Sequence, residues 1–191
     1  MKKGIWAVLA VVVIAIIVVV AVMFLGGKEE NSPNQVQGGE QTGVKIQTAE
    51  DMQKLFNDMN AKLQNTLPSV EVREVDITDE VSVTTMTGLK SKNNVEAIVA
   101  AEPFMSAQAF SAVMVKVSDG ANIEEMKKEM IDNIDMRKWI CVSAEKARVT
   151  NYGNIIFLVM SSEEWGKPVY DEFKQAVGGT VGKELERSEA I

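Results

Sequence analysis

The sequence contains no histidine. Without an imidazole, the chain cannot build a Ser-His-Asp or Cys-His catalytic group, most kinds of zinc site, or a histidine-based pH sensor. Any catalysis would have to use carboxylates, lysine, tyrosine or a serine–lysine pair. From the sequence we therefore assign no catalytic residue, no cofactor and no metal ligand.

Cysteine is almost as scarce. Cys141 is the only one, so the chain cannot form an intramolecular disulfide. It lies in the apolar run Trp139-Ile140-Cys141-Val142, which predicts a buried side chain rather than a reactive thiol, because no histidine is present to lower its pKa. For the same reason we expect Trp139 to belong to the core.

Charge is missing from Ile5 to Leu25. As a helix this segment would rise roughly 32 Å, about the thickness of the hydrocarbon core of a bilayer. It is longer than the apolar core of a cleaved signal peptide, no A-x-A cleavage pattern follows it, and no cysteine near its end could carry a lipid. Residues 1–25 are therefore predicted to form an uncleaved signal-anchor that crosses the lipid bilayer once.

The charges that flank this segment predict its orientation. Lys2 and Lys3 precede it, whereas Lys28, Glu29 and Glu30 follow it. Because positive charge is retained in the cytoplasm, the N-terminus is expected inside and the rest of the chain outside. The predicted location is the cell membrane, with the C-terminal domain outside the cytoplasm.

The segment 26–46 is rich in Gly, Gln and Asn and has few apolar residues, which predicts a flexible linker with a reach of about 25 Å. Residues 47–191 have the size of one domain with its own core. The whole chain carries 27 acidic and 20 basic residues, a formal charge of −7. This acidic excess argues against nucleic acid and against anionic lipid headgroups as ligands.

Three helices are predicted in the domain. Thr48 and Asp51 form the sequence signature of a capping box, and the apolar spacing that follows predicts a helix that Pro68 ends. A second helix is expected from about Asn122 and a third over Glu163–Val177. The segment Asp79–Leu89 is ambiguous, because its β-branched residues favour a strand while its ends resemble helix caps.

Alternating apolar residues predict five strands, of which the last two form a hairpin: Val70–Ile77, Val95–Ala101, Phe110–Val117, Ala147–Asn151 and Asn154–Ser161. Phe110–Val117 is apolar on nearly both faces and should lie centrally in the sheet. The predicted fold class is α+β, with a mainly antiparallel sheet and helices packed on one face.

Ser143 and Lys146 match the S-x-x-K nucleophile motif of penicillin-recognising enzymes. The S-D-N and K-T-G elements that accompany it in those enzymes are absent. A pattern with two fixed positions arises often by chance, so an ordinary turn before a strand is the favoured interpretation.

The other patterns favour structural roles. Of the 11 methionines, Met52, Met59, Met126 and Met130 fall on apolar helix faces, which indicates core packing rather than a copper site. Two acidic groups lack the spacing of a calcium loop and are expected to be solvated: Asp76, Asp79 and Glu80, and Asp132 with Asp135.

The segment Phe110–Ser161 has a familiar pattern. An apolar strand ends in Val115-Lys116-Val117, a helix opens at Asn122, and a strand follows Ala144-Glu145-Lys146. This resembles a domain-of-unknown-function family found in anchored or lipid-modified exported proteins of Clostridia-type Gram-positive bacteria. The resemblance covers Val95 to Val177. It implies an exported location, supplies no activity or catalytic residue, and suggests that Asp79–Leu89 is a short helix.

The favoured function is a non-enzymatic, membrane-anchored extracytoplasmic binding or accessory module of unknown ligand. The alternative is a cell-envelope hydrolase or transferase that uses carboxylates or the pair Ser143 and Lys146, and a deep pocket around these residues would support it. A third possibility is a sensor that works through its anchor helix, although small residues are too few there to indicate a tight helix dimer.

Overall fold

The structure is a computed structural model that describes residues 43–189. The predicted anchor, its orientation and the linker up to residue 42 lie outside these residues. Within residues 43–189, no helix combines the length and the apolar character that crossing a membrane requires.

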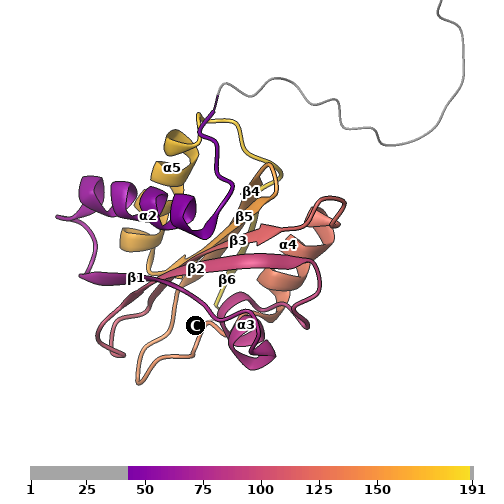
Figure 1. Cartoon of the computed structure of the whole chain (residues 1–191). Helices are drawn as coiled ribbons and strands as arrows, with labels where there is room; N and C mark the ends of the chain where they lie inside the picture. Colours follow the sequence, from indigo (N-terminus) through magenta and orange to yellow (C-terminus); the bar gives the residue numbers. More distant parts are fainter. Residues whose placement is uncertain (1–42, 190–191) are drawn as a thin grey trace, which may run out of the picture. The chain divides into compact units, whose positions relative to one another are not determined.

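The described residues form a six-stranded sheet in which every neighbouring pair is antiparallel. Its order is β1-β2-β3-β5-β4-β6 (Figure 1). The strands are β1 Val70–Glu74, β2 Val95–Pro103, β3 Phe110–Val117, β4 Lys146–Tyr152, β5 Ile155–Ser161 and β6 Leu185–Ser188. The antiparallel sheet and the central place of Phe110–Val117 are confirmed. The short edge strand β6 was not predicted.

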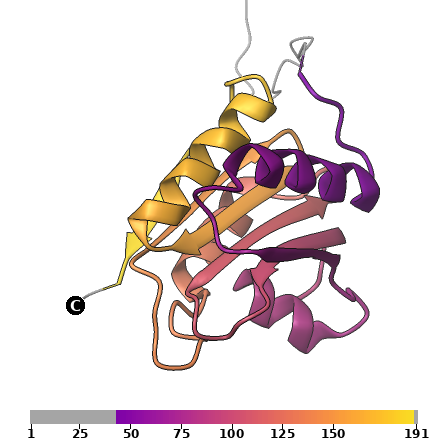
Figure 2. The same cartoon turned by 90° about the vertical axis from the view of Figure 1, so that its left-hand side faces the viewer.

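Helices cover both faces of the sheet, so the prediction of helices on one face is wrong (Figures 1 and 2). One face carries α2 (Ala49–Leu63) and α5 (Glu163–Ala176), and the other carries α3 (Glu80–Thr87) and α4 (Ile123–Asn133). The reason lies in β3. Its residues alternate between two cores, and since both sets are apolar, each face needs a helical cover.

The predicted capping box is present at the start of α2. Asp51 N donates to Thr48 Oγ1 at 3.2 Å, and Thr48 N donates to Asp51 Oδ2 at 3.1 Å. The backbone N–H groups of Gln47 and Thr48 lower the pKa of the Asp51 carboxyl. The helix ends at Leu63, and a turn separates it from Pro68.

The ambiguous segment is the helix α3, as the resemblance suggested. Asp79 caps its start by accepting from Val81 N at 3.1 Å and Ser82 N at 3.3 Å, and Gly88 caps its end with a φ of 77°. The caps therefore outweigh the β-branched content. Gly88 also lies tightly against α4, because a Cβ there would lie 2.7 Å from both Ile134 N and Met130 O.

Candidate interaction surface

Two loops meet at one end of the sheet. Residues 104–109 connect β2 to β3, and residues 134–145 connect α4 to β4. Ile140 N donates to Ser106 O at 3.2 Å and joins the two loops. Figures 1 and 2 show these loops projecting beyond the strands, at the end opposite the point where the described chain begins at Gly43.

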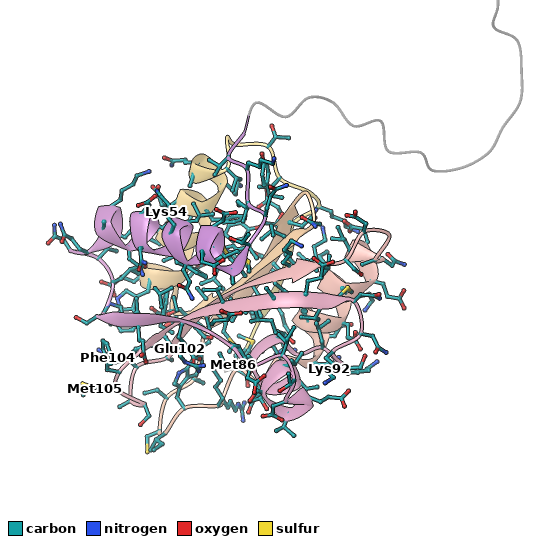
Figure 3. All side chains as sticks on the ribbon, viewed as in Figure 1. Lys54, Met86, Lys92, Glu102, Phe104 and Met105 are labelled. Carbon is teal, nitrogen blue, oxygen red and sulfur yellow. The ribbon has the colours of Figure 1, made fainter. Side chains whose placement is uncertain are left out.

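These loops expose large apolar side chains. Phe104 is 72 % exposed, Met105 62 %, Ile140 65 % and Val142 37 %. We call these four residues the loop patch. They account for four of the six large apolar side chains that are exposed in the described residues. Figure 3 shows Phe104 and Met105 at the outer edge of the molecule. Apolar side chains that gather on a surface in this way indicate an interaction site.

Cys141 lies within the same loop and is exposed, so the prediction of a buried side chain is wrong. Its backbone has a φ of 63°, and it belongs to no strand or helix that could turn it towards the core. Trp139 is partly buried against the core beneath α3 and α4. The apolar run therefore divides, with Trp139 packing inwards and the next residues facing out.

A polar cluster holds the α4–β4 loop to the sheet. Lys138 Nζ lies 2.6 Å from Glu102 Oε1 and 3.1 Å from Ser111 Oγ. Ser111, which is 1 % exposed, donates its own hydroxyl to Glu102 Oε1 at 3.1 Å. Arg73 also contacts the Glu102 carboxylate, at 3.3 Å. These bonds connect the loop to both β2 and β3.

The end of β5 provides a second attachment for both loops. Ser161 Oγ donates to Ala109 O at 2.7 Å, and Glu145 N donates to Ser161 O at 3.0 Å. Within the α4–β4 loop, Ala144 N donates to Met136 O at 2.8 Å. The loop patch is therefore carried on backbone that is fixed before any partner arrives.

The charges near the loop patch are paired inside the domain. Lys138 and Arg73 share the Glu102 carboxylate, and Arg137 pairs with Glu189. This surface therefore offers apolar contact beside cations that already form ion pairs, rather than a field of free positive charge.

Ser143 and Lys146 line the same open pocket of about 540 Å³, together with Arg137, Ala144, Glu145, Glu163, Ser188 and Glu189. Ser143 lies in irregular backbone before β4. Among residues 43–189, no hydrogen bond joins Ser143 to Lys146. Instead Lys146 Nζ lies 3.1 Å from Glu163 and 3.5 Å from Glu186.

These ion pairs are unfavourable for Ser-Lys chemistry. Both contacts direct Lys146 Nζ to carboxylates and not to the Ser143 hydroxyl, whose proton a general base would have to accept. Hydrogen bonds from Arg148, and then from Lys146, lower the pKa of the Glu163 carboxyl. The pocket holds the two motif residues without arranging them as nucleophile and base.

The two acidic groups are exposed and serve local structure. Asp76 accepts from Thr78 N at 2.8 Å, and Asp79 caps α3. Asp132 pairs with Lys128, and Asp135 accepts from Arg137 N at 2.8 Å. In the described part of the chain, no three His, Cys, Asp or Glu side chains converge as metal ligands would. The methionines predicted for the core are buried there.

Comparisons with models of known protein families, with curated protein sequences and with solved structures find no match to this chain.

Proposed function

We propose that the chain is a membrane-anchored extracytoplasmic binding module, non-enzymatic, which contacts another protein through the loop patch. The observation that supports this is the loop patch itself: four exposed apolar side chains on two loops whose backbone is fixed by hydrogen bonds. Exposed apolar area is unfavourable in water unless a partner covers it. A preformed surface also loses little conformational entropy on binding.

A protein is favoured over a lipid surface as the partner. The cations that neighbour the loop patch are already paired, and the chain as a whole carries a charge of −7, so anionic headgroups would gain little and be repelled.

The shape of the loop patch favours a different protein over a second copy of the chain. Projecting loop tips need an apolar recess to receive them. The pocket lined by Asn122, Glu125 and Glu129 exposes more polar than apolar surface and would receive Phe104 or Ile140 poorly. The pocket beside Ser143 exposes more apolar surface, but five charged residues line it, and an apolar loop tip seated there would remove their charges from water.

Site-specific photo-cross-linking in the cells that produce the chain tests this proposal. A photoreactive residue at Ile140 should give a discrete cross-linked species that contains a second protein. The matched control is the same residue at Lys54, on the exposed face of α2 (Figure 3). Equal cross-linking from both positions, or none from Ile140, would contradict the proposal.

The alternative, a cell-envelope hydrolase or transferase, has one observation in its favour, namely the pocket that contains both Ser143 and Lys146. The ion pairs of Lys146 weigh against it. It therefore ranks second.

A further inference from the structure

The last described residues, 182–189, form a segment that touches α4, β4 and the loop that carries half of the loop patch. We call this segment the C-terminal strap. It contains β6, which pairs with β4 alone at the edge of the sheet. We propose that the C-terminal strap sets the position of the α4–β4 loop and so controls the loop patch. The effect of the strap on the position of the loop does not depend on what the protein binds. The effect of the strap on binding rests on the proposed function.

The start of the strap is fixed by a buried lysine of α4. Lys127 is fully buried, and its Nζ lies 2.7 Å from Asn151 Oδ1, 2.7 Å from Lys183 O and 2.6 Å from Glu124 Oε1. Three partners satisfy the three N–H bonds of the ammonium. A glycine is needed at position 182, because a Cβ there would collide with the Asn151 side chain. Lys127 therefore fixes the strap to α4 and β4 at once.

The middle of the strap caps the end of α4. Arg187 donates to Asp132 O at 2.5 Å and to Ile134 O, and its Nε lies 3.3 Å from Met136 Sδ. The last carbonyls of a helix have no partner within the helix, and α4 has no basic residue in its last turn. Arg187 supplies the missing donors and fixes the point where the α4–β4 loop begins.

The end of the strap holds the other end of this loop. Glu189 N donates to Glu145 O at 2.9 Å, and Arg137 Nε lies 2.5 Å from Glu189 Oε1. Ile140 and Val142 lie between these attachment points in sequence. The strap thus holds the loop on both sides of its exposed apolar residues.

The strap can open without unfolding the rest of the domain. β6 has four residues, alternately half-buried and exposed, whereas β3 and β5 are buried along most of their length. Short edge strands open at a lower free energy than buried central strands. Opening would remove the Arg187 cap and the Glu145 contact together, while Lys138 would still hold the loop to the sheet. We infer that the loop would remain attached but lose its fixed conformation.

The sole cysteine provides the test. Cys141 is exposed in the α4–β4 loop, so a nitroxide label attaches there in the full chain, in detergent micelles, without any added cysteine. Arg187→Ala should shorten the rotational correlation time of the label by about twofold, as expected when an ordered loop becomes mobile. Arg187→Lys, which keeps a charged donor, should recover part of the order.

Lys62→Ala is the matched control, because it breaks an ion pair with Glu172 that touches neither the strap nor the loop. In this variant the nitroxide at Cys141 should have the same rotational correlation time as in the unchanged chain. If Arg187→Ala does not fold, Glu189→Ala serves in its place, since it removes only the contact with Arg137 at the end of the strap. It should mobilise the label to a smaller extent.

A label that stays as ordered in a folded Arg187→Ala variant as in the unchanged chain would overturn the inference, and so would an ordered label in folded Glu189→Ala where Arg187→Ala does not fold. This readout needs no partner. It can therefore succeed where the cross-linking from Ile140 fails, and the two results judge the strap and the proposed function separately.

Discussion

Lys138 Nζ lies 2.6 Å from the Glu102 carboxylate, and both side chains are largely shielded from water, with 13 % and 22 % of their surfaces exposed. The two residues are 36 positions apart in sequence. This contact joins the α4–β4 loop to β2, and the neighbouring Ser111 joins it to β3. It fixes the loop that carries Ile140 and Val142 to the sheet through side chains.

Replacing Lys138 with Met should lower the free energy of unfolding by about 1–3 kcal/mol, because a shielded carboxylate then loses its main partner. Urea unfolding of the full chain in detergent measures the change. The control, Lys54→Met, breaks an ion pair in which Lys54 is 76 % exposed and should cost within about 0.5 kcal/mol. An equal loss in the free energy of unfolding for the two variants would show that the Lys138 contact contributes no more than an exposed ion pair.

Alanine substitutions at Gly88 and Gly120 distinguish the destabilisation due to backbone strain from that due to close packing. Their φ angles are 77° and 83°, so alanine is strained at both, by about 1–2 kcal/mol. Only at Gly88 would the new Cβ meet backbone, at 2.7 Å, because nothing lies within 4 Å of Gly120. Gly88→Ala should therefore cost at least about 1 kcal/mol more than Gly120→Ala by thermal or urea unfolding. Indistinguishable costs would contradict the docking of α3 onto α4.

The contribution of Glu163 to the stability of the domain should decrease as the pH falls. Its folded pKa is lowered below the ordinary value of 4.5, first by the hydrogen bond from Arg148. A lowered carboxyl pKa stabilises the fold above the unfolded pKa, and this contribution is lost as the pH falls through the folded value. Glu163→Gln should therefore be less stable than the unchanged chain at pH 6, and the difference should shrink as the pH approaches 3.

Denaturation midpoints measured across this pH range test the prediction. Glu164→Gln is the control, since it removes the same charge from the same helical turn, and Glu164 has no ion pair with Arg148 or Lys146 among the described residues. A difference for Glu163→Gln that stays constant with pH, or that matches Glu164→Gln throughout, would refute the assigned role of the Arg148 bond.

The ion pairs of Lys146 predict that Ser143 is not acylated. A fluorescent penicillin should label the full chain no more than it labels Ser143→Ala, with a penicillin-binding protein as the positive control. Covalent labelling that depends on Ser143 would show that Lys146 can act as a base, and would restore the hydrolase or transferase as the leading function.

Local signals in the sequence predicted much of the fold. The Thr48–Asp51 capping box, the helix start at Asn122 and the hairpin around Gly153 are each encoded within a few residues. The pattern of Phe110–Val117 also indicated a strand buried on both faces. That pattern already required helices on both sides of the sheet, and the one-sided arrangement predicted from it was an error of interpretation.

Other features depend on contacts between distant residues. The sequence Leu185–Ser188 is short and half charged, and it becomes a strand only because the edge of β4 is available to pair with it. Likewise the run from Trp139 to Val142 has the composition of a core segment. Its exposure follows from its place on a loop that Lys138 and Arg187 hold in position, and no local pattern distinguishes an apolar surface from an apolar core.

The most direct test of the central claim combines Phe104→Ser and Ile140→Ser in one chain, with the photoreactive residue at Met105. Because both side chains are exposed, the unfolding transition should stay within about 0.5 kcal/mol of that of the unchanged chain. The account predicts that the cross-link from Met105 to a second protein disappears while the fold persists. A cross-link that survives at full yield in this variant would contradict the assignment of the loop patch as the binding surface.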